Sequence, residues 1–231
     1  MYQFGSGSVQ LAGFGAIRIP HIVLPRPHQA GCNGLAKRLI DILGAVLLIA
    51  MLAVPMLAIA LAIRLDSPGP TLFRQKRIGY ADRAFETLKF RTMWHHAVAP
   101  GIFQQTCRHD VRVTRIGHFL RQTSMDELPQ LFNVLRGDMS LVGPRPHAPG
   151  TCAGGKPFEL VTPRYQLRHR VRPGITGLAQ VRGLRGETET EDLLLRRVES
   201  DLEYIESWSL WLDLIILLRT AKAVLGTQNA Y

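Results

Sequence analysis

The stretch "ILGAVLLIAMLAVPMLAIALAI", Ile42–Ile63, is 22 residues long and contains no charged side chain. As a helix rising 1.5 Å per residue it would be about 33 Å long, enough to cross a hydrocarbon core of about 30 Å. Pro55 lies well inside the run, where a proline removes a backbone donor and clashes with the preceding turn. The stretch therefore predicts a membrane helix that is kinked or broken near Pro55.

Basic residues lie on both sides of this apolar run. Lys37 and Arg38 precede it, and Arg64 follows it. Because Lys and Arg gather on the cytoplasmic side of membrane segments, both ends are expected on that side. We predict a re-entrant helix hairpin, with a simple span and a buried soluble helix as the alternatives. Asp41, at the start of the run, is expected at the membrane interface beside Lys37 and Arg38.

The charge of the 231-residue chain is high and uneven. The net charge is +10, and residues 1–186 hold 24 of the 28 Lys and Arg but only 9 of the 18 acidic residues. A basic body indicates anionic partners such as nucleic acid, acidic lipid headgroups or phosphorylated substrates. The three cysteines, Cys32, Cys107 and Cys152, are far apart and form no CxxC pair, which supports neither a disulfide framework nor a zinc site.

Patterning divides the chain into three parts. Residues 1–34 are rich in Gly and Pro and read as a flexible extension, residues 35–66 hold the predicted re-entrant helix, and residues 67–231 form a separate domain outside the membrane. Within the last part, Thr71–Met93 predicts two strands around a turn near Gly79–Arg83. Residues 94–113 read as a polar linker, and Thr114–Pro146 predicts two short helices before a Gly/Pro loop. The predicted fold class is α+β and predominantly helical.

Apolar residues recur at spacings of three or four from Leu194 to Ile215, which predicts one long helix. The first half of this helix is acidic and amphipathic. Its second half, "WSLWLDLIILLRT", is apolar on most faces and carries Trp208 and Trp211. Tryptophan is enriched at membrane interfaces, so we expect these two residues to contact lipid. An ordinary buried core helix is the alternative.

A pair of carboxylates lies in "TSMDELPQL", Thr123–Leu131. Ser124 and Glu127 match a capping box, which would do no more than begin a helix. A helix start also attracts anions, and Asp126 and Glu127 would have lowered pKa values there. Ionised carboxylates can hold Mg²⁺, and one of them could attack phosphorus as a nucleophile. Arg121, five residues before Asp126, could neutralise phosphate oxygens.

Other candidate phosphate-binding residues lie near turns and strands. Arg145 stands between Pro144 and Pro146, whose fixed φ angles suit a rigid bidentate grip on phosphate or a stack on a base. Lys89 and Arg91 are two residues apart, on one face of a predicted strand. A solvated surface charge is the alternative for each of these basic residues.

Several ordered motifs resemble those of the bacterial sugar transferases, the monotopic polyprenyl-phosphate phosphoglycosyl transferases that prime exopolysaccharide and O-antigen synthesis. The resemblance covers 35–231 and rests on "KRLIDILGA", "FETLKFRTM", "LRQTSMDELPQLFNVLRGDMSLVGPRP", "RPGITGLAQV" and "WSLWLDLIILLRT". It implies a re-entrant helix at Pro55 and a catalytic domain on the cytoplasmic face of the bacterial inner membrane. Nucleic acid is not an expected partner, and a homodimer is left open.

The resemblance also implies site roles. Asp126 would attack the β-phosphate of a UDP-sugar, release UMP and pass the phosphosugar to undecaprenyl phosphate. Glu127, together with Asp126, would bind Mg²⁺. Arg121 would bind phosphate, and the PRP motif at 144–146 would contact the nucleotide.

The chain departs from the family pattern in two places. Ala179 stands where the family commonly has Trp, and "RGLRGETETED", 182–192, replaces the usual stretch. These departures leave the sugar and lipid pocket open, and glucose, galactose and N-acetylated sugars are all compatible. Three other functions compete: a catalytically silent membrane scaffold, a nucleic-acid binder, and a glycosyl transferase that releases UDP. The apolar run and the 7% aromatic content disfavour the nucleic-acid binder.

Overall fold

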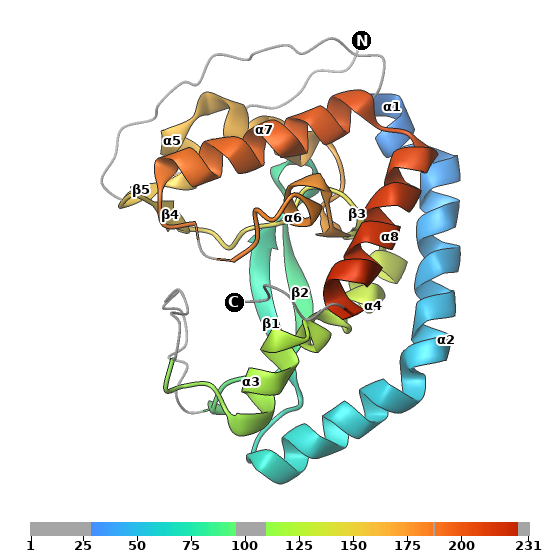
Figure 1. Ribbon diagram of the computed structural model, residues 1–231, viewed down its shortest axis with the longest axis vertical. Coiled ribbons are helices and arrows are strands. Elements are labelled where there is room, and N and C mark those ends of the chain that lie inside the picture. Colours follow the sequence, from blue (N-terminus) through green and yellow to red (C-terminus); the bar gives the residue numbers. More distant parts are fainter. Residues whose placement is uncertain (1–28, 96–109, 187, 226–231) are drawn as a thin grey trace.

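The computed structural model describes residues 29–95, 110–186 and 188–225. It has the predicted α+β fold, in which helices surround a central β-hairpin (Figure 1). Most of the predicted linker, 96–109, and most of the N-terminal extension, 1–28, lie outside the described residues. The main helices are α1 (Gln29–Cys32), α2 (Leu35–Asp66), α3 (Arg115–Gln122), α4 (Gln130–Arg136), α5 (Phe158–Val161), α6 (Leu178–Val181), α7 (Glu191–Ser207) and α8 (Leu210–Leu225).

Helix α2 runs along one edge of the molecule and bends in its second half (Figure 1). The helix continues through Pro55, so the expected break takes the form of a bend in one continuous helix. Among the described residues it is the one helix long and apolar enough to cross a membrane, and only 11% of its most apolar 18-residue window is buried. The alternative of a buried soluble helix is therefore wrong.

The predicted hairpin is confirmed. Strand β1 (Leu72–Ile78) pairs antiparallel with β2 (Ala84–Phe90), and the turn lies between Gly79 and Arg83. Ala81 and Asp82 have positive φ angles at its tip. Two further pairs are short: β3 (Ser140–Val142) lies parallel to β6 (Gly174–Thr176), and β4 (Cys152–Ala153) lies antiparallel to β5 (Lys156–Pro157).

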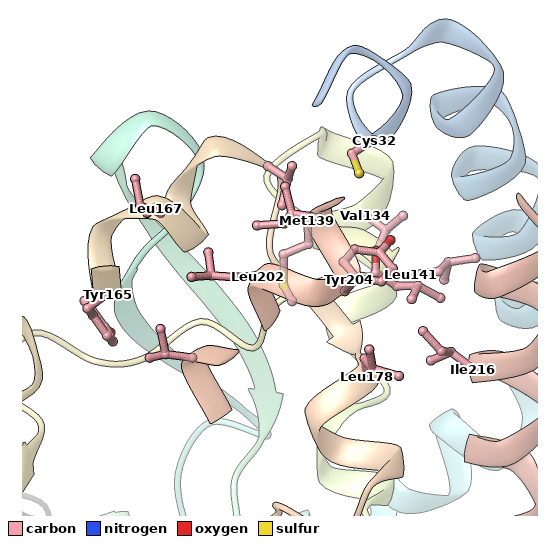
Figure 2. Packing of buried hydrophobic residues seen from close by; sticks show 14 of the residues in the cluster. Cys32, Val134, Met139, Leu141, Tyr165, Leu167, Leu178, Leu202, Tyr204 and Ile216 are labelled. Carbon is pink, nitrogen blue, oxygen red and sulfur yellow. The ribbon is translucent and has the colours of Figure 1, made fainter. Parts of the chain in front are cut away.

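The main core lies between α7, α8, α4 and β3. Figure 2 shows Leu202 and Tyr204 of α7 in one cluster with Val134, Leu141 and Ile216. Burying these apolar surfaces is the main favourable term that holds the helices together. The core therefore joins the C-terminal helices α7 and α8 to α4 and β3.

The prediction of a single helix from Leu194 to Ile215 is wrong. Helix α7 ends at Ser207, and α8 begins at Leu210. Ser209 caps the second helix, because its Oγ accepts a hydrogen bond from the Leu212 amide at 3.1 Å. The apolar spacing runs on across the corner since both helices turn apolar residues toward the same core.

A buried charge network joins α2 to α8. Lys37 Nζ lies 3.1 Å from Asp41 Oδ1 and 2.8 Å from Asp213 Oδ2. Asp41 also accepts a hydrogen bond from the Leu141 amide at 3.1 Å. Asp41 thus pairs with Lys37 as expected, but it lies inside the protein, only 2% exposed, and not at an interface. A buried carboxylate needs such partners, and β3 and α8 supply them.

The two tryptophans have different environments. The Trp208 indole nitrogen donates to Asp213 Oδ2 at 3.2 Å, and the ring packs against Gly31. Its expected place at a membrane interface is therefore corrected to a packing and hydrogen-bonding role between α7 and α8. Trp211 is 68% exposed and remains available to lipid.

Candidate active site

The carboxylate pair lies on a single 3-10 turn, Met125–Glu127, between α3 and α4. Ser124 precedes it in the left-handed conformation, with φ of 56°, and its side chain makes no capping hydrogen bond. The capping-box interpretation of Ser124 and Glu127 is therefore wrong. The left-handed residue reverses the chain after α3, which turns Glu127 toward cations from other elements.

Glu127 is held by two cations. Lys89 Nζ, from β2, lies 2.6 Å from Oε1, and Arg145 Nη1 lies 2.9 Å from Oε2, while Arg145 Nη2 contacts Oε1 to complete a bidentate pair. Burial opposes ionisation of this carboxyl, but Arg145 and Lys89 outweigh burial and hold the pKa of Glu127 well below its usual range. Glu127 is the ionised, fixed member of the pair.

Asp126 has a different environment. It is 8% exposed, its nearest cation is Lys89 with Nζ 3.6 Å from Oδ2, and within the described part of the chain its carboxylate accepts no hydrogen bond. Burial raises the pKa of Asp126, and the neighbouring Glu127 charge adds to this, although Lys89, Arg121 and Arg145 oppose it. The expectation of lowered pKa values therefore holds for Glu127 and is wrong for Asp126. At Asp126, burial raises the pKa, and the start of one short 3-10 turn does not offset this rise.

Arg121 reaches the site from the last turn of α3. Its Nε donates to Thr92 Oγ1 at 2.9 Å, and its charge lowers the pKa of Asp126. The helix approaches closely because Gly117 faces the Thr92 carbonyl, and a Cβ added at Gly117 would lie 2.1 Å from that oxygen. Glycine at this position thus allows α3 to carry Arg121 beside the carboxylates.

The Pro144–Pro146 loop follows β3 and presents Arg145 to Glu127. The Pro144 carbonyl accepts a hydrogen bond from the Gly174 amide at 2.9 Å, and the Pro146 carbonyl accepts one from Arg77. The prolines limit the backbone on either side of Arg145. The structure therefore brings Arg121, Lys89 and the PRP motif together around Asp126 and Glu127, as predicted.

Arg91 is the exception among the predicted site residues. Strand β2 ends at Phe90, and Arg91 is buried at the C-terminus of α2. Its guanidinium donates to the carbonyl oxygens of Pro68 and Ser67, each at 2.7 Å, and to Ser67 Oγ at 2.9 Å. Ser67 is the C-cap residue of α2 and Pro68 follows it, so Arg91 satisfies carbonyls just beyond the helix, and its Nη2 also lies 3.4 Å from the Ile63 carbonyl in the last turn. The expected placement beside Lys89 is thus corrected to a helix-capping role.

Asn133 of α4 links two elements of the site and was not predicted from the sequence. Its Oδ1 accepts from the Leu88 amide at 2.9 Å, and its Nδ2 donates to the Glu86 carbonyl at 2.6 Å. These bonds fix α4 against β2, and so Glu127 against Lys89. A polar residue within the apolar stretch "LFNVL" was the available signal.

Sequence reasoning also did not single out Arg77, Arg168 and Arg185 as candidate site residues. Arg185 comes from the stretch that departs from the family pattern. Burial and then the nearby Arg145 lower its pKa, and Glu127 opposes this, which places Arg185 within electrostatic range of the site. Its Nε donates to the Gln180 carbonyl at 3.2 Å.

The donor set fits a magnesium ion that is shared with a substrate. Within the described residues no group of three or more His, Cys, Asp or Glu side chains could hold a metal by itself. Mg²⁺ commonly takes one or two carboxylates and completes its shell with water and substrate phosphates. Asp126, without hydrogen-bond donors, has oxygens available for such a role, while both Glu127 oxygens contact cations.

Comparison with known proteins assigns the chain to a family. Residues 32–227 match the model of the bacterial sugar transferase family, and the chain belongs to that family. It is 54% identical over 197 residues to a UDP-glucose:undecaprenyl-phosphate glucose-1-phosphate transferase of Caulobacter vibrioides, covering 85% of this chain and 72% of the relative. It is 52% identical over 209 residues to an undecaprenyl-phosphate glucose phosphotransferase of Komagataeibacter xylinus, covering 90% of this chain.

A more distant relative has another sugar in its name. The chain is 41% identical over 218 residues, 91% of its length, to a UDP-N-acetylgalactosamine-undecaprenyl-phosphate N-acetylgalactosaminephosphotransferase of Aeromonas hydrophila. The matched part spans 39% of the Komagataeibacter protein and 49% of the Aeromonas protein. The similarity therefore covers nearly all of this chain but less than half of each of these two relatives.

The capping role of Arg91 predicts a stability effect. Arg91→Gln should lower the free energy of unfolding by about 2 kcal/mol or more, because it removes charged hydrogen bonds to buried carbonyls. Denaturant titration in detergent micelles measures this. The matched control is Arg74→Gln, which changes an exposed arginine 3.9 Å from Glu86 and should stay within about 0.5 kcal/mol. Equal effects of the two substitutions would contradict the capping role.

Proposed function

We propose that this protein transfers glucose 1-phosphate from UDP-glucose to undecaprenyl phosphate and releases UMP. The observation that carries the proposal is the geometry of the carboxylate pair: Asp126 is without hydrogen-bond donors beside Glu127, which two cations hold in place. A nucleophile needs accessible lone pairs, and a fixed neighbour keeps it oriented. The names of the Caulobacter and Komagataeibacter relatives favour glucose as the sugar.

In the first step, an Asp126 carboxylate oxygen attacks the phosphorus that carries the sugar. A bond forms between this oxygen and the β-phosphorus, and the bond to the oxygen bridging the two phosphates breaks. UMP leaves with that oxygen and its electron pair. The product is an aspartyl phosphosugar, and the step requires no net proton transfer.

In the second step, a phosphate oxygen of undecaprenyl phosphate attacks the same phosphorus. The bond to Asp126 breaks, the carboxylate is restored, and a diphosphate-linked lipid sugar is released. The two steps proceed at one carboxylate, so donor and acceptor would use the site in turn. The proposed reaction is the first membrane-committed step of exopolysaccharide or related glycan synthesis.

The surrounding cations stabilise charge during both steps. Lys89 lies between the two carboxylates, with Nζ 2.6 Å from Glu127 and 3.6 Å from Asp126, and Arg145 contacts Glu127. Lys89 and Arg121, whose charges both act on Asp126, would bind phosphate oxygens. Pro144 and Pro146 keep Arg145 on a rigid loop against the nucleotide. Of the predicted pair, Asp126 has oxygens available to hold Mg²⁺, whereas both Glu127 oxygens contact Lys89 and Arg145. When bound, the ion would neutralise diphosphate charge. In a site shielded from water, each of these charge contacts becomes stronger.

The location proposed for this chemistry is the cytoplasmic face of the bacterial inner membrane. Helix α2 exposes many large apolar side chains, among them Leu43, Met51 and Val54. On α8, Leu210, Trp211 and Leu218 are also exposed. Lipid is the natural cover for such surfaces. We propose that the bent α2 enters the bilayer and returns, which keeps both of its ends and the site on one side.

Asp126→Asn should abolish UMP release, because an amide cannot form the acyl phosphate. The assay combines detergent-purified protein, Mg²⁺, undecaprenyl phosphate and a panel of UDP-sugars, and it separates UMP from UDP by chromatography. Asp192→Asn is the control, since Asp192 is exposed on α7 and pairs with Arg196. We expect a loss of at least 10³-fold for Asp126→Asn and full activity for the control. If Asp126→Asn turned over as fast as the wild type, Asp126 would not be the nucleophile. UDP as the product would rule out phosphosugar transfer.

The raised pKa of Asp126 predicts an acid limb in kcat/KM for the UDP-sugar. Protonation removes the nucleophile, so the rate should fall as pH drops through a pKa above the ordinary aspartate value of about 3.9. Lys89→Met should move this limb to higher pH, because Lys89 favours the ionised form. Lys76→Met, an exposed lysine on β1, should leave it in place. A limb that does not move in Lys89→Met would contradict this assignment.

The re-entrant geometry predicts that both ends of α2 are labelled from the same side. Leu35→Cys and Pro70→Cys place thiols at exposed positions just inside and just beyond the helix, in a background without the native cysteines. A membrane-impermeant maleimide should label both in inverted inner-membrane vesicles and neither in intact spheroplasts. Labelling of the two thiols from opposite sides would establish a span instead.

A further inference from the structure

The loop that presents Arg145 is held through its carbonyl groups. Each of four successive carbonyl oxygens accepts a hydrogen bond from another segment: Pro144 from the Gly174 amide at 2.9 Å, Arg145 from Arg168 Nη2 at 2.7 Å, Pro146 from Arg77, and His147 from the Ile78 amide at 3.3 Å. Two of the four loop residues are prolines and have no N–H, so the loop interacts mainly as an acceptor. Its conformation depends on the donors around it.

Arg168 donates to the Arg145 carbonyl itself and contacts two further partners. Besides the Arg145 carbonyl, its Nη1 lies 3.1 Å from His147 Nδ1, and its Nε donates to Asp201 Oδ2 at 2.7 Å. Because a guanidinium only donates, His147 Nδ1 must accept, and His147 is neutral. Burial and the charge of Arg168 lower the pKa of His147 accordingly. One planar group thus fixes two adjacent residues of the loop.

Asp201 orients Arg168 from the opposite side. It lies on α7, the helix that crosses the molecule above the hairpin (Figure 1). The Arg168 and Asp201 side chains are 2% and 4% exposed, and the Tyr165 ring lies 5.0 Å from the guanidinium carbon. A buried cation requires a counter-charge, and removal of one partner leaves the other uncompensated. The chain of contacts therefore runs from α7 through Arg168 to the Arg145 backbone and on to Glu127.

We propose that Arg168 and Asp201 are positioning residues of the active site, which act through Arg145. They hold the backbone carbonyl of Arg145. The Arg145 guanidinium then contacts both oxygens of Glu127 and faces the donor diphosphate. This proposal rests on the proposed function. It gives α7, whose own residues do not contact Asp126 or Glu127 in the described structure, a place in donor binding.

The test is whether the effect of Asp201 depends on Arg145. Asp201→Asn keeps size and shape but removes the counter-charge. We expect it to lower kcat/KM for UDP-glucose at least tenfold, and to weaken the Kd for UDP-glucose in calorimetry by a similar factor. In an Arg145→Ala background the same substitution should change either quantity less than twofold, because the guanidinium that Arg168 and Asp201 position is absent. Arg168→Lys should resemble Asp201→Asn, since an ammonium lacks the planar fork.

Two controls separate positioning from folding. Arg196→Gln, in the exposed Arg196–Asp192 pair of α7, should leave both quantities unchanged. If Asp201→Asn does not fold, the double variant Arg168→Met with Asp201→Leu replaces it, since an apolar pair can substitute for a buried ion pair without loss of stability. We expect that variant to be folded, by thermal unfolding, and still impaired at least tenfold.

The outcomes are decisive in each direction. The same fold-change in the wild-type and Arg145→Ala backgrounds would show that Asp201 acts on the whole fold and would overturn the proposal. A folded variant with unchanged Kd and kcat/KM would overturn it as well. The failure of wild-type protein to release UMP would instead count against the proposed function, while the Kd comparison would still test the positioning of Arg145.

Discussion

The rest of the site depends on the burial of one ionised carboxylate. The Glu127 side chain is only 14% exposed, and a largely buried charge is tolerated only with close opposite charges. Lys89 brings β2 to it, and Arg145 brings the loop after β3. Asn133 closes the arrangement, because it fixes α4 against the backbone of β2. Elements distant in sequence thus converge on a single side chain, and the position of Asp126 beside it follows.

This arrangement separates two neighbouring carboxyls by environment. Glu127 has its charge neutralised and its oxygens engaged, so it serves as a fixed support. Asp126 is buried with weaker compensation, and its raised pKa reflects a carboxylate that is poorly stabilised in its ionised form. A poorly solvated carboxylate is also a more reactive one, and Arg121 and Lys89 are placed to meet the phosphate it would attack. The opposite pKa directions therefore match a division between nucleophile and support.

The apolar helix α2 is joined to the same segments by polar contacts near its two ends. At its start, Arg38 donates to the Val134 and Leu135 carbonyls at the end of α4, and Asp41 accepts from Leu141 in β3. Just beyond its end, the Ser67 and Pro68 carbonyls accept hydrogen bonds from Arg91, the residue after β2. Exposed apolar residues of α2, among them Leu43, Met51 and Val54, lie between these attachments. A helix built to contact lipid is thereby part of the framework that orients Lys89, Glu127 and Arg145.

Local sequence patterns were sufficient to predict helices and strands, but not to predict which distant residues their side chains contact. Alternating residues and a Gly-containing turn predicted the β1–β2 hairpin, and a charge-free run with Pro55 predicted a bent apolar helix, because strand, turn and helix formation depend on near neighbours. The capping box of Ser124 and Glu127 and the placement of Arg91 beside Lys89 failed because Glu127 and Arg91 met partners from remote segments. The unbroken helix through Trp208 failed because the apolar spacing continues across the corner between α7 and α8. By itself, the sequence determined the family, the carboxylate pair and the basic residues around it. Only the tertiary structure decided that Glu127 is neutralised while Asp126 is not, and that Arg77 and Arg168 hold the loop, because charge pairing depends on distances that the folded chain sets.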